Sequence, residues 1–475
     1  MKKFVRPLRG AHALGLAAAT LTLAGCASFS PDGGFDKVAA LTRERTGQSV
    51  AWQRSPTEAG AAQARVAELL GQPLSAETAV ELALLNNRGL QASFAELGIA
   101  EASLVRAGRL ANPSFTFGRV AGGGITEIDR SLMFNVLGLL TMPVVRQVEQ
   151  RRFEQAQYQA ALDAIGIAGE TRRAFFAAVA AQQLVAYADQ VKEAADASNE
   201  LGRRMQQAGN FTKLAQMRQQ AFQADAAARL NRARQQATAE RERLIRLMGL
   251  SGAQLAFRLP DRLPELPATP ITSNDAEQTA MDRRLDVQMA RHDAETTAQV
   301  LGLTRATGMV NVLNAGYANK SQTGEARRNG YEIEVELPLF DFGTARSARA
   351  EAIYSQSVER AAEIAVNARS EVRESYAAYR SAYDLALHYR DDVVPLSKRI
   401  SDENLLRYNG MLLGVFELLA DAREQVTSVT GYVEALRDHW IAESRLQSAL
   451  TGRSPGMSVA MPRPSAEAAA ADPGH

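Results

Sequence analysis

The sequence predicts a mainly α-helical protein with a small membrane-spanning β component, built as a duplicated unit of one helix, two strands and two long helices. Three observations predict this fold class. Two long stretches lack helix breakers, each follows a pair of short segments with strand-like alternation, and the same order of segments occurs in both halves of the chain. The composition agrees, because aromatic residues make up only 6% of the 475 residues, which suits long, closely packed helices.

The charge balance argues against a nucleic-acid partner. The chain holds 54 basic and 53 acidic residues, for a formal net charge of +1, whereas nucleic-acid-binding domains need a strongly basic face. Beyond the N-terminal region, no apolar stretch reaches the roughly 20 residues of a membrane-spanning helix. Any further membrane crossing is therefore expected to be made by strands.

Residues 1–25 have the layout of a bacterial lipoprotein signal peptide. A basic start is followed by the apolar run 14–23, and Leu-Ala-Gly precedes Cys26. We expect cleavage before Cys26 and attachment of diacylglycerol and a further acyl chain such as palmitate, since stable anchoring needs more than one chain. Ala27, rather than Asp, favours the outer membrane in the lipoprotein pattern that this resembles. The alternative is an ordinary cleaved signal with an incidental cysteine. Because Cys26 is the only cysteine, the acylated chain has none left for a disulfide or metal site.

The chain repeats itself with a period of roughly 195 to 200 residues, which is typical of a duplicated domain. Residues 83–91 match residues 280–288 in order, and Pro143 matches Pro338. The repeats are predicted at 74–258 and 275–452, after an N-terminal, lipid-anchored extended segment at 26–73. A connector with four prolines at 259–274 is expected to be extended, and the tail at 453–475 is expected to be disordered.

Strands are predicted first from the segment 331–337, which alternates apolar and acidic side chains with a period of two. In a membrane barrel the apolar side chains would face lipid, and Glu332, Glu334 and Glu336 would face the lumen. In a soluble sheet the same pattern would mark a half-buried strand. The predicted strands lie at about 113–120, 128–137, 309–319 and 329–339.

The stretches after the strands predict very long helices. No proline lies between Pro143 and Pro260, and small or apolar residues recur every three or four positions, as in a coiled-coil seam. A helix of some 60 residues would be on the order of 90 Å long. A compact helical bundle is the alternative. The long helices are predicted at about 144–206, 211–249, 343–407 and 414–451.

These features together resemble the TolC-type outer-membrane efflux factors, specifically their lipoprotein branch. The resemblance covers about 74–452 and rests on the duplication, the Asn86-Asn87 helix start, the Pro-Leu-Phe-Asp-Phe-Gly run at 338–343, and two helix-turn segments at 204–214 and 407–421. One departure is Pro143-Val-Val-Arg, which stands where a Phe-Asp-Phe-Gly turn would be expected. The junction between strand and helix is therefore uncertain in the first repeat.

The resemblance implies a homotrimer in the outer membrane. Each protomer would give four strands to a 12-stranded β-barrel, continued by a long periplasmic α-helical coiled-coil barrel. Four strands cannot close a barrel alone, which independently favours several copies. The family's partners are a periplasmic adaptor (membrane fusion) protein and an inner-membrane pump, and the duct itself is passive.

Six residues receive site roles from the resemblance. Gly209, Asn210, Gly410 and Met411 would form the periplasmic tip where the adaptor docks, with glycine supplying conformations that other residues resist. Glu417 and Asp421, one helical turn apart, would form the constriction of the duct. The alternatives are plain helix C-caps for the glycines and a solvated helix face for the two acids.

Catalysis is not expected. His292, His388 and His439 occur singly, with no second histidine at metal-binding spacing, and no phosphate loop or nucleophile elbow is present. The lipid on Cys26 is the only attached group expected, so no cofactor or metal is predicted. Two other functions stay open: a duct for type I protein secretion, and a periplasmic coiled-coil scaffold lipoprotein that conducts nothing. The sequence does not identify the cargo.

Overall fold

The computed structural model describes residues 28–272, 275–307, 312–336, 340 and 342–452. They form two compact units, each assembled from three separate segments. Unit 1 contains residues 28–41, 89–161 and 287–364, and unit 2 contains residues 42–88, 162–286 and 365–452. Each unit takes segments from both predicted repeats, so the two repeats fold together rather than as separate bodies. The predicted signal peptide and C-terminal tail lie outside the described residues.

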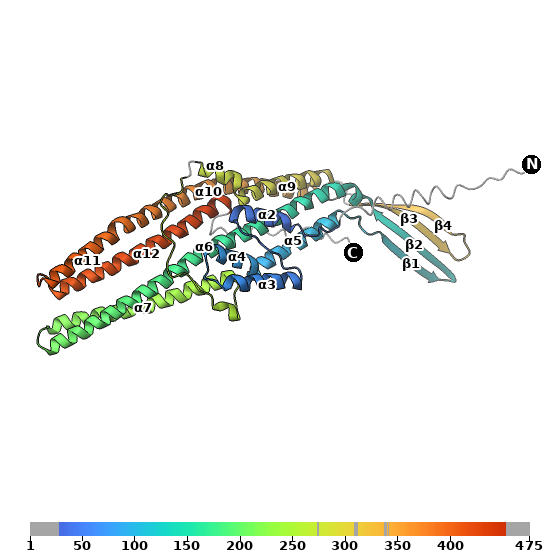
Figure 1. The fold of residues 1–475 in the computed structure, drawn as a ribbon. Coiled ribbons are helices and arrows are strands. Elements are labelled where there is room, and N and C mark those ends of the chain that lie inside the picture. The colour runs from blue at the N-terminus through green and yellow to red at the C-terminus, as the bar shows by residue number, and fades with distance from the viewer. Residues whose placement is uncertain (1–27, 273–274, 308–311, 337–339, 341, 453–475) are drawn as a thin grey trace, which may run out of the picture. The chain divides into compact units, whose positions relative to one another are not determined.

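Unit 1 carries a four-stranded antiparallel sheet in the order β1-β2-β3-β4 (Figure 1). Its two hairpins come from the two repeats, and the pairing of β2 with β3 joins them. Gly123 and Gly124 connect β1 to β2 with φ of 60° and 82°, the two positive values that a tight two-residue hairpin turn needs. The strands are β1 (Ser114–Gly122), β2 (Ile125–Asn135), β3 (Leu313–Gln322) and β4 (Arg328–Val335).

All four predicted strands exist, but the junction after β2 differs from the prediction. The helix α6 (Val136–Gln207) begins directly after Asn135 and runs through Pro143, whereas the prediction placed strand up to 137 and helix only from 144. The Asn135 side chain explains the early start, because its Oδ1 accepts a hydrogen bond from the Gly138 backbone N–H at 2.5 Å and so caps the first turn. Pro143 removes one backbone donor without ending the helix.

The segment predicted as extended at 26–73 is largely helical, so that prediction is wrong. It contains α2 (Phe35–Thr46) and α3 (Pro56–Leu70). Ser55 and Glu58 form a capping box at the start of α3, with Glu58 N–H donating to Ser55 Oγ and Ser55 N–H donating to the Glu58 carboxylate. With Pro56 at the first helical position, this is a strong helix-start signal.

Unit 2 consists of helices packed on an apolar core that includes Leu82, Phe175, Val179, Leu244 and Leu436. Two helical hairpins extend from it, one formed by α6 and α7 and the other by α11 and α12, and Figure 1 shows both turns at the left. In addition to α3 and α6, its helices are α4 (Ala76–Asn86), α7 (Lys213–Met248), α8 (Ala276–Arg283), α10 (Thr344–His388, from Ala365 on), α11 (Val394–Asn409) and α12 (Val415–Thr451). A short 3₁₀ helix lies at Gly252–Leu255.

One predicted helix is interrupted. The stretch 343–407 was expected to be continuous, but a π-helical turn at Tyr389–Val393 separates α10 from α11. Pro395 supplies the reason, because it has no N–H to donate to the carbonyl four residues earlier. The Val394 N–H instead donates to the Tyr389 carbonyl, five residues back.

The proline-rich connector has no helix or strand at 259–272 and is bound to unit 2 by aromatic side chains. Tyr383 Oη donates to the Pro267 and Ala268 carbonyls at 3.0 and 3.1 Å, and Trp440 Nε1 donates to the Pro264 carbonyl at 3.1 Å. Its buried leucines, Leu259, Leu263 and Leu266, belong to the core of this unit.

The two repeats have corresponding helix breaks, and in each repeat one side chain at the break bonds to the end of a long helix. α5 (Arg88–Ala107) follows α4 after Asn87, and α9 (Leu285–Thr307) follows α8 after Arg284. Asn87 Nδ2 donates to the Leu247 carbonyl at 2.9 Å, and Arg284 Nη1 donates to the Ala449 carbonyl at 3.2 Å. Each side chain thus satisfies a carbonyl at the end of a long helix, α7 or α12, that has no partner within that helix.

Among the described helices, none combines the length and the apolar composition that a membrane-spanning helix requires.

Candidate functional site: an amphipathic sheet and two helical turns

One face of the sheet in unit 1 carries an exposed apolar band. The strand register places Phe115, Leu132, Tyr317 and Tyr331 in one row across all four strands. Their exposed fractions are 65%, 37%, 53% and 85%, so no part of the described chain covers them. Phe134, Ile333 and Val335 lie on the same face and are also exposed. Phe117 shares this face too, but its row continues with the polar residues Arg130, Asn319 and Asn329. An exposed apolar band of this kind marks a contact with lipid or with another apolar surface.

The opposite face is polar. Glu334 pairs with Asn314, which pairs with Asn135, and Asn314 Nδ2 donates to the Glu334 carboxylate at 2.8 Å. Glu332 lies on the same face, opposite Gly316. Glu336 follows the end of β4, where its N–H still donates to the Val312 carbonyl at 3.3 Å. The three glutamates therefore follow the predicted alternation, two within the strand and one just beyond it.

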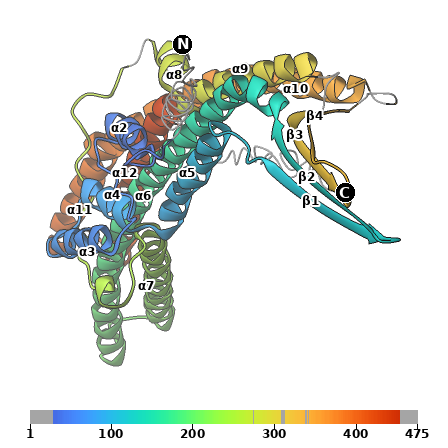
Figure 2. The ribbon, with the colours of Figure 1, turned by 90° about the vertical axis from the view of Figure 1, so that its right-hand side faces the viewer.

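The sheet is open at both edges. Within the described residues, β1 and β4 each have one neighbouring strand, so a row of backbone N–H and C=O groups is left at either side. Water can satisfy such groups, but hydrocarbon cannot. Figure 2 shows both hairpins of this sheet from a second direction.

The turn between α6 and α7 in unit 2 is built around Gly209. Its φ is +80°, the left-handed conformation that glycine adopts without steric cost. The Asn210 N–H donates to the Met205 carbonyl at 2.9 Å, and the Gly209 N–H donates to the Gln206 carbonyl at 3.0 Å. This pair of bonds is the Schellman motif of a helix C-terminus.

The turn between α11 and α12 repeats this geometry one residue later than expected. Leu412 N–H donates to the Arg407 carbonyl at 2.8 Å, Met411 N–H donates to the Tyr408 carbonyl at 3.0 Å, and Met411 has a φ of 57°. Gly410 has a φ of −79°, so the expectation that this glycine supplies the unusual conformation is wrong. Met411 is the structural counterpart of Gly209, and its side chain is 94% exposed.

Amide side chains join the two helices of the α6/α7 hairpin. Buried and half-buried amides cross between α6 and α7: Asn199 Nδ2 donates to Gln223 at 2.7 Å, and Gln216 Nε2 donates to Asn199 at 2.9 Å. Gln223 in turn donates to Asp196 at 2.8 Å. The hydrogen bond from Lys192 is the main reason that the pKa of Asp196 is lowered.

The predicted constriction acids lie in the first turns of α12. The backbone of Glu417 is helical, but its side chain lies outside the described residues. Asp421 is half-buried, and its Oδ2 has no hydrogen-bond partner among the described residues. The structure therefore places the backbones of both residues close to the turn.

Cys26 lies outside the described residues, but the segment that follows it is tied to unit 1. Ser30 donates to the Glu101 carboxylate from both its N–H and its hydroxyl, each at 2.5 Å. Phe35 packs edge-on against Phe94 with ring centroids 4.9 Å apart. This segment and the sheet thus belong to the same unit.

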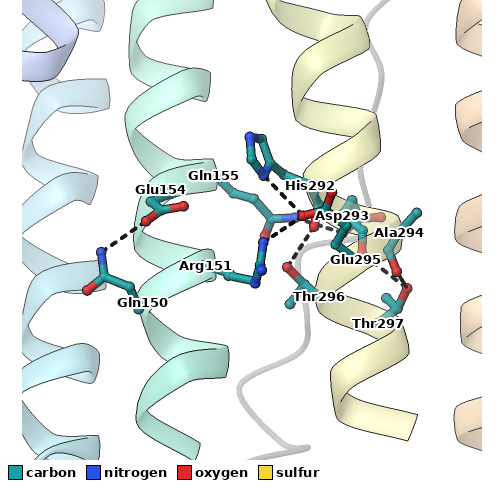
Figure 3. A network of polar contacts seen from close by, with 10 residues as sticks. All are labelled: Gln150, Arg151, Glu154, Gln155, His292, Asp293, Ala294, Glu295, Thr296 and Thr297. Atoms are coloured by element: carbon teal, nitrogen blue, oxygen red, sulfur yellow. Dashed lines mark hydrogen bonds and ion pairs between the residues drawn. The ribbon is translucent and has the colours of Figure 1, made fainter. Parts of the chain in front are cut away.

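A polar network in unit 1 joins helices from the two repeats (Figure 3). Arg151 on α6 pairs with Glu295 on α9 at 2.6 Å, and Gln155 donates to Asp293 at 2.9 Å. His292 stacks on Tyr158 with centroids 5.3 Å apart. Among the described residues, no group of three or more histidine, cysteine and acidic side chains could hold a metal ion.

His439 has nothing in its sequence surroundings that marks it, but in unit 2 its imidazole ring lies in an unusual, apolar environment. It is fully buried, and neither ring nitrogen has a hydrogen-bond partner among the described residues. Tyr379, Tyr383 and Trp440 surround the ring at centroid distances of 5.2 to 5.6 Å. Burial lowers its pKa to about 4, because removal from water disfavours the charged imidazolium.

Comparison with solved structures finds the same arrangement in outer-membrane proteins. The CmeC outer membrane channel of Campylobacter jejuni is 15% identical with a TM-score of 0.69, over 81% of this chain and 85% of that one. The outer membrane protein VceC of Vibrio cholerae is 17% identical with a TM-score of 0.63, over 84% and 99%. The MtrE outer membrane channel of Neisseria gonorrhoeae, in its open state, is 16% identical with a TM-score of 0.65, over 79% and 88%.

No protein-family model and no curated protein sequence matches the chain. The likeness is therefore one of three-dimensional structure at low sequence identity. It includes the helix-rich architecture and the small antiparallel sheet, in agreement with the expectation from the sequence. The chain has the fold of the TolC-type outer-membrane channels.

Proposed function

We propose that this protein is the outer-membrane exit duct of a tripartite efflux system. It would passively conduct substrate, delivered by an inner-membrane pump through a periplasmic adaptor, to the cell exterior. The observation that carries the proposal is the sheet of unit 1, with an exposed apolar face, a polar opposite face and two open edges. Such a sheet is stable in a bilayer only when other strands close it.

Three copies would supply twelve strands and remove every edge. The apolar row from Phe115 to Tyr331 would face lipid, and Glu332 and Glu334 would face an aqueous lumen. The exposed alternation and the fold of known outer-membrane channels support this arrangement. The lipid on Cys26 would add an anchor on the unit that holds the sheet. Conduction requires no catalytic group, and we propose none.

The turns at Gly209 and Met411 are proposed as the periplasmic tip where the adaptor docks. Met411 and Leu412 are 94% and 82% exposed, and apolar side chains at this exposure are suited to an apolar partner surface. Asn210 and Gly410 would shape the two turns beside them.

The oligomer and the pore are tested on protein purified from outer membranes in detergent. We expect a trimer that converts to monomer on heating, a β-sheet contribution in circular dichroism, and ion conductance in planar lipid bilayers. A Cys26→Ser protein that is water-soluble, monomeric and non-conducting would instead support the scaffold alternative.

The proposed constriction is tested separately with the Glu417→Ala, Asp421→Ala double variant. Rings of carboxylates near the tip would restrain the closed aperture and attract cations. We expect cells with the double variant to become more permeable to large antibiotics and the conductance of the purified protein to lose cation preference. Glu424→Ala, on an exposed position of the same helix, is the matched control. Permeability and selectivity equal to wild type would remove both residues from the constriction.

A further inference from the structure

A cleft of about 360 Å³ lies in unit 2 between the α6/α7 hairpin and α12. Its lining includes Val191 on α6, Phe222 on α7, and Val426 on α12. The volume falls within the roughly 300 to 1,000 Å³ typical of small-molecule sites. Neither the docking turns nor the constriction acids contribute to it.

The cleft carries an excess of positive charge. Arg218, Arg229 and Arg423 line it together with one acid, Asp225. Asp225 is already paired with Arg229 at 2.7 Å. Among the described residues, Arg218 and Arg423 make no ion pair, so two guanidinium groups in this cleft lack an anionic partner.

The charged side chain of Arg423 packs on the aromatic ring of Phe222, which is part of the apolar wall of the cleft. The guanidinium carbon of Arg423 lies 4.5 Å from the ring centroid of Phe222, a cation–π contact between α12 and α7. Ala226 is 1% exposed and closes the wall beside it. A ligand with a flat apolar body would contact this wall while its anionic group pairs with the arginines.

We propose that this cleft binds a small amphipathic organic anion, with an apolar body and a carboxylate or sulfonate group. The combination of unpaired arginines, an apolar wall and a small-molecule volume favours this class over a neutral or cationic solute. A bound anion would join the two hairpins and stabilise unit 2. The proposal does not depend on conduction, because it concerns a site in the helical part of the chain.

The test uses the full-length protein in lipid nanodiscs and two fluorescent probes that differ in one group. Anilinonaphthalene sulfonate carries the anion, and N-phenylnaphthylamine is its neutral counterpart, with empty nanodiscs as the blank. We expect saturable binding of the sulfonate and only non-saturable partitioning of the amine. Saturable binding of both probes with similar affinity would overturn the proposal without any substitution.

The Arg218→Gln, Arg423→Gln double variant tests the residues. We expect its affinity for the sulfonate probe to fall by at least about tenfold, because the anion loses its charge-assisted hydrogen bonds to both guanidinium groups. Arg232→Gln, on an exposed position of α7 outside the cleft lining, should bind like wild type. Unchanged affinity in the double variant would overturn the proposal. Binding of a glutamate-rich helical peptide, with none of the sulfonate probe, would do the same and make the cleft a protein-docking surface.

Discussion

At the scale of single residues, the structure contains two side chains in unfavourable surroundings. His439 is buried without a hydrogen-bond partner among the described residues, and Met411 has a left-handed backbone conformation. Both conditions cost free energy. His439 is enclosed by the aromatic side chains that bind the connector, and Met411 forms an exposed turn, so their costs can be measured separately.

His439 should make the protein acid-sensitive. Its folded pKa of about 4 lies below the ordinary histidine value of 6.5, so the unfolded chain binds a proton first as the pH falls. Stability from this group is therefore complete above about pH 6.5 and decreases by up to about 3 kcal/mol by pH 4. We expect His439→Phe to reduce the dependence of the melting temperature on pH between 7 and 4.5.

Comparing how the melting temperature changes with pH in wild type and in His439→Phe separates the contribution of His439 from that of other groups. Burial raises the pKa of Glu443, whose carboxylate lies 4.0 Å from His439 Nε2, and this acid is present in both proteins. His388, with a side chain that is 60% exposed, provides the control substitution His388→Phe. If the melting temperature of His439→Phe depended on pH as strongly as that of wild type, the charged imidazole would have to be solvated in the folded protein.

The conformation of Met411 predicts different effects of substitution at two neighbouring positions. Met411→Gly should stabilise the turn by about 0.5 to 1 kcal/mol, because glycine adopts positive φ without a Cβ clash. Gly410→Ala should be close to neutral, since a φ of −79° suits any residue. Gly209→Ala should cost about 1 kcal/mol at a φ of +80°. Hydrogen exchange at the turn amides measures all three, and a loss at Gly410→Ala as large as at Gly209→Ala would contradict this assignment.

At the scale of elements, the sequence predicts the four strands and most helices because their signals are local. Alternation at 331–335 and the capping residues around long apolar seams belong to the segments themselves. Where the structure departs from the prediction, three local signals in the sequence account for it: the Ser55–Glu58 capping box, Asn135 as a cap, and Pro395 inside a helix. The shift from Gly410 to Met411 is different, because only the hydrogen bonds of the folded turn reveal which residue has positive φ.

Arg284 links several helices, a role that the sequence pattern does not indicate. It is 2% exposed, pairs with Asp286 at 2.6 Å and Glu371 at 2.9 Å, and donates to the Ala449 carbonyl. It therefore binds the α8/α9 break to α10 and α12. Nothing in the sequence pattern distinguishes it from its neighbour Arg283, because burial depends on segments more than 80 residues away.

We expect Arg284→Met to destabilise unit 2 strongly. Removing the guanidinium leaves two carboxylates and a carbonyl in a buried site, a loss of about 3 to 5 kcal/mol. Arg283→Met, at an exposed position one residue earlier, should change stability by less than about 0.5 kcal/mol. The free energies are measured by denaturant unfolding followed by circular dichroism. Equal effects of the two substitutions would show that the Arg284 ion pairs contribute little.

At the scale of the whole molecule, the two sequence repeats do not correspond to the two compact units. Each compact unit contains residues from both repeats, and β2 and β3 join the repeats within the sheet. The Arg151–Glu295 pair joins them again between α6 and α9. One repeat alone would leave two strands without these neighbours, and two strands are marginal by themselves. Separate expression of 74–258 is therefore not expected to give a folded half.

The faces of the sheet predict how charge substitutions act on assembly in the membrane. Ile333 and Glu334 are adjacent in β4 and point to opposite faces, apolar and polar. A lysine on a lipid-facing position costs about 2 to 4 kcal/mol near the bilayer midplane, whereas a lumen position tolerates charge. We expect Ile333→Lys to reduce the yield of heat-modifiable trimer in outer membranes severalfold and Glu334→Lys to leave the yield near wild type. Gel analysis of membrane fractions measures both. Equal yields would mean that Ile333 does not face lipid, and a loss confined to Glu334→Lys would reverse the assignment of the two faces.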